Sequence, residues 1–198
     1  MKSDGKIVND SLTNEKSDQS VSEEDHNIIK NVLHESVNEY GRLIDKYQVP
    51  VYNLLLRMLH DRDTAKELTQ QVFVKAYEAL PGFRFEFRFF SWLYRIAVNQ
   101  ALNYQKKQRK FVGIDNITNL SDESNDFDTS NDVQLQSIID NMKDKYKSVI
   151  ILKYFQQLTY QEVAFALNIT EKKVRSRLYD ARLQLKVMLE KTDYFHSN

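Results

Sequence analysis

The sequence contains no cysteine, and it has only four glycines and two prolines in 198 residues. The absence of cysteine excludes disulfides and thiolate metal ligands, and it suits a reducing compartment. So few helix-breaking residues, together with long segments of helical periodicity, predict an all-α chain. No run approaches the roughly eighteen apolar residues of a membrane-spanning helix, and the N-terminus lacks the apolar core of a signal peptide. We therefore expect a cytoplasmic protein with no membrane insertion of its own.

Signals of catalysis are also missing. The sequence has no phosphate-binding glycine loop, no nucleophile constellation and no paired-carboxylate site. Its four histidines, His26, His34, His60 and His196, are scattered without the spacing of metal ligands. We therefore expect no catalytic residues, no metal and no cofactor, and we predict that the protein is not an enzyme.

The formal net charge is zero, but the charged residues are unevenly distributed. Residues 84–110 hold seven basic and one acidic side chain, and residues 141–191 hold eleven basic and five acidic, so each segment carries +6. Residues 111–140, between them, hold seven acidic side chains and no basic one. Two basic segments separated by an acidic one indicate nucleic-acid binding more strongly than the total charge does.

Two segments are predicted to lack a folded core. Residues 1–25 are polar, with seven acidic and three basic side chains, and we expect a disordered N-terminal tail. Residues 111–135 lack periodicity and are rich in Asp, Asn and Ser, which predicts an acidic linker extended by its own charge. We expect two small helical domains on either side of this linker, with no fixed mutual orientation in the free protein and preferential proteolysis within the linker.

Local signals predict where the helices of the N-terminal half begin. Ser36 and Glu39 fit a capping box for one helix, and Pro50 fits the first position of another. Asp63 or Thr64 is expected to cap a further helix, which ends where proline and glycine follow each other at 81–82. The expected inner face of that helix consists of Ala65, Leu68, Val72, Ala76 and Ala79.

Residues 83–92 combine aromatic and basic side chains. Five phenylalanines and Trp92 are interleaved with Arg84 and Arg88. Such a composition suits single-stranded nucleic acid, because bases stack on aromatic rings while basic groups hold the phosphates. We nevertheless expect most of the phenylalanines to lie in the hydrophobic core.

The helix predicted after this segment carries a polar stripe. Arg95, Asn99 and Lys106 lie on one side of it, with Asn103 beside them. Core packing does not explain this stripe, and asparagine is suited to reading base edges. We expect the stripe to contact nucleic acid.

Residues 159–182, with the sequence TYQEVAFALNITEKKVRSRLYDAR, predict a helix-turn-helix. Val163, Ala164 and Leu167 give the first helix one apolar side. Asn168 tolerates the left-handed conformation in which a helix ends and turns. Thr170 can cap the second helix by accepting from the backbone N–H groups of its first turn.

The second of these helices has an apolar and a basic face. Val174, Leu178, Ala181 and Leu185 lie within about 60° of one another at about 100° per residue. The opposite, basic face is typical of a recognition helix that lies in a DNA major groove. The alternative is a helical hairpin whose charged face is only solvated. We expect base edges within reach of Lys172, Ser176 and Tyr179, with Lys173 and Asp180 beside them, and phosphate contacts from at least two of Arg175, Arg177 and Arg182.

Three segments match known signatures in the right order. They are DTAKELTQQVFVKAY at 63–77, FRFEFRFFSWLYRIAVNQALNY at 83–104, and KYKSVIILKYFQQLTYQEVAFALNITEKKVRSRLYDAR at 145–182. Together they resemble the RNA polymerase sigma factors of the sigma-70 family, extracytoplasmic-function type. The resemblance covers roughly residues 28–190.

The resemblance implies two DNA-binding regions and a polymerase-docking face. Region 2, about residues 26–110, would dock on the clamp helices of the largest subunit of core RNA polymerase and hold the melted −10 strand. The docking residues would be Asp63, Glu67, Gln70, Gln71 and Val74, and the −10 residues Arg84, Arg88, Trp92, Arg95, Asn99, Asn103 and Lys106. Region 4, about residues 136–191, would read the −35 duplex and pack on the polymerase flap, leaving residues 192–198 as a tail.

Family members are commonly inhibited by an anti-sigma factor, so the resemblance also implies such a partner. The linker would run through the RNA channel of the polymerase, where a polyanion imitates the transcript. A helix-turn-helix regulator that is not a polymerase subunit is the alternative, but it leaves the segment at 83–104 unexplained. A helical scaffold that does not bind DNA leaves both basic segments unexplained.

The chain departs from the family pattern at several positions. Gln71 stands in place of a common glutamate, Asn103 in place of an aspartate, and Asn168 in place of the turn glycine. Asp180 occupies a position that is often basic, and Lys143 one that is often proline. The −35 preference of this chain therefore does not follow from the family pattern.

Overall fold

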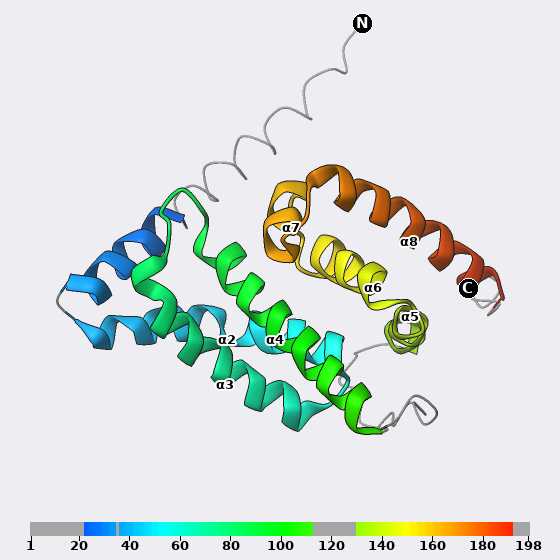
Figure 1. Cartoon of the computed structure of the whole chain (residues 1–198), viewed down its shortest axis with the longest axis horizontal. Helices are drawn as coiled ribbons and strands as arrows, with labels where there is room; N and C mark the ends of the chain where they lie inside the picture. Colours follow the sequence, from blue (N-terminus) through cyan, green and yellow to red (C-terminus); the bar gives the residue numbers. More distant parts are fainter. Residues whose placement is uncertain (1–21, 35, 113–129, 192–198) are drawn as a thin grey trace, which may run out of the picture.

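The computed structural model describes residues 22–34, 36–112 and 130–191 (Figure 1). Within these ranges every regular element is a helix and there is no strand, as the all-α prediction requires. The expected tail up to residue 21, most of the expected linker and residues 192–198 lie outside the described residues. Helices extend further than the expected boundaries, because one helix spans residues 22–34 and α5 begins at Ser130.

The described helices form two units. The first, residues 22–112, contains the helix over 22–34 followed by η1 (Val37–Glu39), α2 (Tyr40–Leu59), α3 (Arg62–Ala79), η2 (Leu80–Gly82) and α4 (Phe89–Val112). The second, residues 130–191, contains α5 (Ser130–Asp140), α6 (Asp144–Ile150), the π-helical turn η3 (Ile151–Phe155), α7 (Tyr160–Leu167) and α8 (Glu171–Lys191). In the first unit α2, α3 and α4 pack on one another; in the second, α8 packs on α6 and α7.

The helix starts of the first unit differ from those predicted. Ser36 makes no side-chain capping hydrogen bond, and Glu39 instead forms an ion pair with Arg42 at 3.1 Å. The cap of α3 is Asp61, whose carboxylate accepts from the backbone N–H of Thr64. Because this fixes the helix start two residues earlier, Thr64 already lies inside the first turn. The prediction of a cap at residue 63 or 64 was wrong.

Pro50 lies within α2 and does not begin a helix. A proline inside a helix costs about 3 kcal/mol, because it removes one backbone hydrogen bond and crowds the preceding turn. The apolar face of α2 continues across this position, since Tyr47 before it and Val51, Leu54 and Leu55 after it are all buried. Burial of these side chains on both sides of the proline offsets its cost and keeps the 20-residue helix continuous.

The predicted helix-turn-helix is confirmed in its local geometry. Asn168 ends α7 in the left-handed conformation, with φ 53° and ψ 48°. The hydroxyl of Thr170 accepts from the backbone N–H of Lys173 at 3.3 Å at the start of α8. Thr159 and Glu162 form a complete capping box at the start of α7, which the sequence analysis did not identify.

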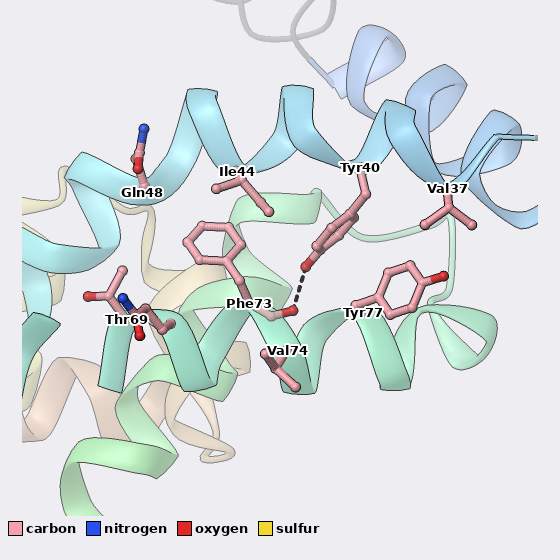
Figure 2. Close-up of a pocket in the computed structure, with 9 residues that line it drawn as sticks. Val37, Tyr40, Ile44, Gln48, Thr69, Phe73, Val74 and Tyr77 are labelled. Carbon is pink, nitrogen blue, oxygen red and sulfur yellow. Dashed lines mark hydrogen bonds between the residues drawn. The ribbon is translucent and has the colours of Figure 1, made fainter. Parts of the chain in front are cut away.

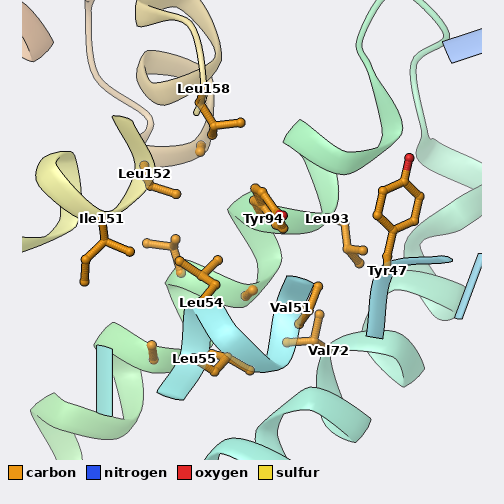
Figure 3. Packing of buried hydrophobic residues seen from close by; sticks show 14 of the residues in the cluster. Tyr47, Val51, Leu54, Leu55, Val72, Leu93, Tyr94, Ile151, Leu152 and Leu158 are labelled. Atoms are coloured by element: carbon orange, nitrogen blue, oxygen red, sulfur yellow. The ribbon is translucent and has the colours of Figure 1, made fainter. Parts of the chain in front are cut away.

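The two units share one apolar cluster. α4 has α2 and α3 on one side and α7 on the other, and η3 contacts α2. Leu54 and Tyr94 of the first unit lie beside Ile151, Leu152 and Leu158 of the second, all of them buried (Figure 3). The sequence analysis expected no fixed orientation, whereas the structure joins the units through this cluster.

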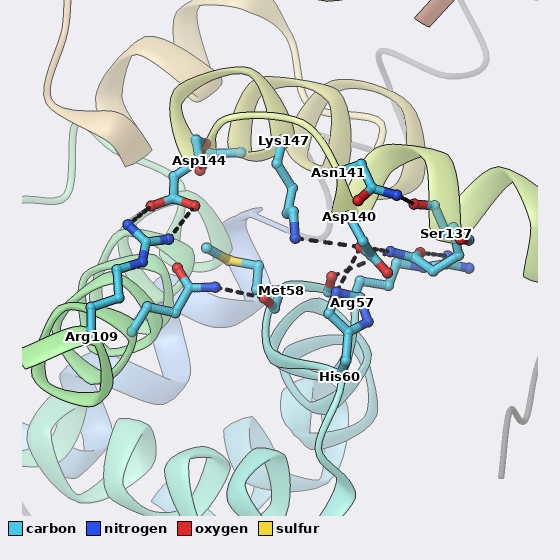
Figure 4. A network of polar contacts seen from close by, with 12 residues as sticks. Arg57, Met58, His60, Arg109, Ser137, Asp140, Asn141, Asp144 and Lys147 are labelled. Carbon is cyan, nitrogen blue, oxygen red and sulfur yellow. Dashed lines mark hydrogen bonds and ion pairs between the residues drawn. The ribbon is translucent and has the colours of Figure 1, made fainter. Parts of the chain in front are cut away.

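Polar contacts between the units lie beside this cluster, near the C-terminal end of α2. Asp140 of α5 lies 2.7 Å from Nε2 of His60 in the first unit, and Lys147 of its own unit lies 3.4 Å from the same carboxylate (Figure 4). Arg109 of α4 forms an ion pair with Asp144 of α6 at 2.8 Å. The contact between the two units therefore spans both their apolar and their charged surfaces.

Candidate nucleic-acid interfaces

The face of α8 gathers the candidate −35 residues. Its opposite side is anchored by Val174, Leu178 and Ala181, all of which are fully buried. Because these three side chains fix the rotation of the helix, the side opposite them faces solvent. The exposed candidates are Lys172, Lys173, Arg175, Ser176, Tyr179 and Arg182, while Arg177 and Asp180 are half-buried.

Three of these residues make side-chain contacts within the second unit, the simplest being Arg182, whose Nε donates to the carbonyl oxygen of Leu178 at 3.1 Å. Arg175 pairs with Glu171 at 3.5 Å, and its guanidinium lies 5.2 Å from the ring centroid of Tyr160. An exposed pair of this kind contributes little stability, so a phosphate could replace the carboxylate. Asp180 accepts a long hydrogen bond of 3.5 Å from the hydroxyl of Tyr146, which directs its carboxylate toward α6. The sequence analysis had placed it beside the centre of the exposed face.

The exposed face of α8 becomes apolar beyond residue 180. Leu183 and Val187 follow Tyr179 at four-residue intervals, and they are 55% and 43% exposed. The sequence analysis missed this apolar continuation, although the spacing of four residues would have shown it. One helix side thus offers polar groups near its N-terminus and an apolar surface near its C-terminus.

The candidate −10 residues divide into two groups along the first unit. Asn99, Asn103 and Lys106 are exposed on α4, and Arg84 is exposed in the preceding loop, where it pairs with Glu86. The remaining three, Trp92, Arg88 and Arg95, are partly covered.

Trp92 packs against two phenylalanines, and this packing shapes the loop before α4. Its ring lies 5.3 Å from that of Phe83 and 5.7 Å from that of Phe89, and both phenylalanines are buried. His26 holds the loop from outside, since its Nε2 lies 3.1 Å from the carbonyl oxygen of Phe87. Phe85 stays 40% exposed. We expected most of the five phenylalanines to lie in the core, but only Phe83 and Phe89 are buried, whereas Phe87 and Phe90 are half-buried.

Arg88 and Arg95 both contact the second unit. Arg88 forms an ion pair of 3.3 Å with Glu162, and Arg95 donates to the side-chain oxygen of Asn168 at 3.4 Å. The guanidinium of Arg95 also lies 5.2 Å from the ring centroid of Phe165. Nearby, burial raises the pKa of Tyr94 to about 12, so its phenol stays protonated and donates to Gln156 at 2.8 Å.

The outer face of α3 carries the candidate docking residues. Asp63, Glu67 and Gln70 are exposed, Val74 is 58% exposed, and Gln71 is half-buried. Gln71 donates to the carboxylate of Glu67 at 2.9 Å. The five residues therefore form one continuous surface that contributes little to the core.

An apolar groove of about 450 Å³ adjoins this surface between α2 and α3 (Figure 2). Tyr40 lies at its base, where its hydroxyl donates to the carbonyl oxygen of Phe73 at 2.7 Å. Burial raises the pKa of Tyr40, so this donor stays protonated. Gln70 and Val74 line the groove as well as the docking face. The remaining lining residues are Val37, Ile44, Gln48, Thr69 and Tyr77.

Comparisons with known proteins assign the family. Sigma-70 region 2 matches residues 43–111, and sigma-70 region 4 matches residues 132–185. The RNA polymerase sigma factor YlaC of Bacillus subtilis (strain 168) is 33% identical over 158 residues, which cover 76% of this chain and 91% of that protein. The chain belongs to the sigma-70 family of RNA polymerase sigma factors.

The sigma factor is of the extracytoplasmic-function type. The sigma factor SigW of Bacillus subtilis (strain 168), of that type, is 29% identical over 178 residues, covering 81% of this chain and 94% of that protein. The sigma-E factor of Haemophilus influenzae (strain ATCC 51907 / DSM 11121 / KW20 / Rd), also of that type, is 30% identical over 173 residues, covering 80% and 91%. The protein therefore directs promoter-specific initiation of transcription with RNA polymerase.

Solved structures share the fold of this sigma factor. The structure of CnrH in complex with the cytosolic domain of CnrY has a TM-score of 0.64 at 18% identity, covering 83% of this chain and 96% of CnrH. The sigma factor RpoE from Bartonella quintana, in complex with the anti-sigma factor NepR, has a TM-score of 0.67 at 16% identity, covering 77% and 97%. Within the described residues, no helix is long and apolar enough to cross a membrane, and no group of acidic or histidine side chains is placed to hold a metal ion.

Proposed function

We propose how the work of this sigma factor is divided among its surfaces. The outer face of α3 and the adjoining groove bind the clamp helices of core RNA polymerase. The loop before α4 and the exposed stripe of α4 hold the melted −10 strand. The polar part of the α8 face reads the −35 duplex, and the second unit also packs on the polymerase flap.

The α8 face is the observation that carries this proposal. Six of its eight candidate residues are exposed on a helix whose opposite side is anchored by fully buried Val174, Leu178 and Ala181. The left-handed conformation of Asn168 and the hydrogen bond from the backbone N–H of Lys173 to the hydroxyl of Thr170 fix where α8 begins after α7. A rigid helix presenting Lys, Arg and Ser side chains is suited to a major groove.

The activity is tested by transcription with purified core polymerase that lacks any other sigma factor. A pool of randomised −10 and −35 sequences is transcribed, and the selected templates are sequenced. This chain should yield a defined pair of elements, because the two contact surfaces lie on one protein. A helix-turn-helix regulator that is not a polymerase subunit would yield no transcripts in this assay.

The role of α8 is tested by changing its face one group at a time. Ser176→Ala should relax the −35 preference at one position, because a lost base contact costs about 1–3 kcal/mol there. Arg175→Ala should weaken binding to all sequences and lower the salt slope by about one unit, as a lost phosphate contact does. Lys186→Ala, exposed on the distal half of the same helix, is the matched control. If Ser176→Ala and the control select the same −35 sequences with equal stringency, α8 does not recognise the −35 element.

We further propose that an anti-sigma factor regulates this sigma factor. We also propose that this sigma factor acts in the cytoplasm together with RNA polymerase and has no catalytic residues of its own. Both solved relatives described above were determined as complexes, one with the cytosolic domain of CnrY and one with the anti-sigma factor NepR. Such a partner should abolish transcription in the core-polymerase assay at stoichiometric concentration. It should also compete with core polymerase for this chain in a binding assay.

A further inference from the structure

The helix over 22–34 is fixed to α2 by a buried carboxylate. Asp25 accepts from the hydroxyl of Tyr47 and from the ammonium of Lys46, the latter at 2.6 Å. Burial raises the pKa of Tyr47, and its hydrogen bond to Asp25 raises it further, so the phenol stays protonated and remains a donor. Sliding the helix along α2 would leave a buried charge without its partners, which is strongly destabilising. The N-terminal end of this helix therefore has one fixed position in the first unit.

His26, the next residue, lies against the loop before α4. In this loop the backbone N–H of Phe87 donates to the carbonyl oxygen of Arg84 at 3.0 Å, which closes a turn. The carbonyl oxygen of Phe87 accepts from Nε2 of His26 at 3.1 Å, so this ring nitrogen carries the proton. Both backbone polar groups of Phe87 are thus bonded. The turn over 84–87 is held by a side chain 61 positions earlier in the chain.

Phe85 is exposed in the middle of this turn, and three side chains determine where its ring lies. Its centroid lies 5.3 Å from that of His26 and 5.3 Å from that of Phe83, both in edge-on arrangements. The ammonium of Lys30, four residues after His26, lies 5.7 Å from the same centroid. An exposed ring beside a cation suits an unpaired nucleotide, because the base stacks on the ring while the cation holds a phosphate.

Core packing uses a different side of this helix. Ile28, Ile29 and Val32 are buried against the rest of the first unit. His26 is half-buried and Lys30 is exposed, and both contact the ring of Phe85. A helix that only covered the core would need neither of these two contacts.

We propose that the helix over 22–34 is part of the strand-binding site, with His26 as a positioning residue for the loop and Lys30 as a phosphate contact. The inference rests on the proposed role of this loop in holding the melted −10 strand. The helix lies outside the match to sigma-70 region 2, which begins at residue 43. His26 acts through the backbone of Phe87. It holds the turn that presents Phe85, so the ring is in place before a base arrives and binding does not have to order it.

The first experiment separates the hydrogen bond of His26 from its ring contacts. His26→Phe keeps a ring beside Phe85 and removes the donor, whereas His26→Gln keeps an N–H donor near the position of Nε2 and removes the ring. Amide hydrogen exchange of residues 84–88 in the full chain should be about fivefold faster in His26→Phe, as expected for the loss of one neutral hydrogen bond. In His26→Gln it should stay close to that of the unchanged chain. Faster exchange throughout the first unit of His26→Phe would show a role in stability alone and would overturn the positioning role.

The second experiment measures strand binding by the holoenzyme formed from core polymerase and this chain. The probe is a fluorescein-labelled, single-stranded 12-nucleotide DNA that carries the −10 element selected by the unchanged chain in the transcription assay. His26→Phe should weaken binding of this probe about fivefold, and His26→Gln should restore it. Lys30→Ala should lower the salt slope by about 0.7, the value for one phosphate of a single strand. Lys186→Ala, which removes an exposed lysine from the second unit, is the matched control.

The outcomes separate this inference from the function on which it rests. Equal strand affinity of His26→Phe and the unchanged chain overturns the positioning role, and an unchanged salt slope in Lys30→Ala overturns the phosphate contact. If Phe85→Ala and Asn99→Ala still weaken strand binding in that case, the −10 assignment stands and only the helix over 22–34 is excluded from the site. If these two variants also bind the probe with unchanged affinity, the loop and α4 are not the strand site, and both proposals are overturned.

Discussion

Adjacent residues of α8 provide a sharp test of which side of this helix packs. Leu178 is fully buried and Tyr179 is 67% exposed. Truncating a buried leucine to alanine removes its transfer free energy and leaves a cavity, and costs about 3–5 kcal/mol. Truncating Tyr179 leaves no cavity, so its cost should stay within about 0.5 kcal/mol. We expect Leu178→Ala to destabilise the second unit far more than Tyr179→Ala does.

The size of the unit makes this loss decisive. At about 0.05–0.15 kcal/mol per residue, a unit of some 60 residues has a free energy of unfolding of about 3–9 kcal/mol by itself. A loss of about 3 kcal/mol reduces the ratio of folded to unfolded second unit by roughly 100-fold. Leu178→Ala should therefore be partly unfolded in the second unit at a urea concentration where the unchanged chain is native.

The chain offers separate signals for its two units. Trp92, the one tryptophan in the sequence, lies in α4 of the first unit, so its fluorescence reports that unit. Circular dichroism at 222 nm reports helix in both units. In urea titrations, Leu178→Ala should lose circular dichroism before tryptophan fluorescence changes. If Tyr179→Ala shifts the midpoint as much as Leu178→Ala, the buried side of α8 has been misassigned.

Three further outcomes are expected. Val74→Asp should weaken binding to core polymerase at least tenfold without changing the melting temperature, because this exposed side chain lies on the docking face. The control is Glu23→Lys on the helix over 22–34. Equal affinity of the two variants for core polymerase would show that the docking site lies elsewhere. Asn99→Ala should reduce permanganate reactivity of the −10 element, and a loss of closed-complex binding alone would contradict this. Asp61→Ala should cost about 1 kcal/mol at pH 7. Hydrogen bonds from Thr64 lower the pKa of the Asp61 carboxyl in the folded chain. The stabilisation by this carboxylate is therefore present above its unfolded pKa and is lost as the pH falls through its folded pKa. In urea titrations at decreasing acid pH, the free energies of unfolding of Asp61→Ala and the unchanged chain should converge, and a constant difference between them would contradict this.

The sequence predicted the helix-turn-helix better than it predicted the helices before it. In α7 and α8 the local signals agree with the packing, because Asn168 and Thr170 lie where the apolar pattern stops and restarts. In the first unit Pro50 resembles a helix start, yet burial of Tyr47 and Val51 on either side of it decides the outcome. Ala79 was expected on the inner face of α3 and is exposed, since the helix ends there.

Features that join distant segments could not be read from local patterns. The groove between α2 and α3 depends on how Tyr40 and Phe73 meet, 33 residues apart. The contact of Arg88 with Glu162 joins residues 74 positions apart. Arg88 was identified as a strand-binding candidate by its neighbours in sequence, but nothing in those neighbours indicates a carboxylate from another helix.

The π-helical turn η3 has a consequence for which changes in chain length the protein can tolerate. In this turn the backbone N–H of Gln156 donates to the carbonyl of Ile151, five residues earlier, at 3.1 Å. Deleting one residue from 151–155 would restore α-helical spacing, and it would rotate everything that follows by about 100° relative to α2. Deleting Ile151 would turn the buried side chain of Leu152 outward, and deleting any of the five residues would remove or displace Phe155, whose ring centroid lies 3.9 Å from the guanidinium of Arg57. In a scan of single-codon deletions selected for transcription, this short segment should be depleted at every position, although alanine at exposed Tyr154 survives.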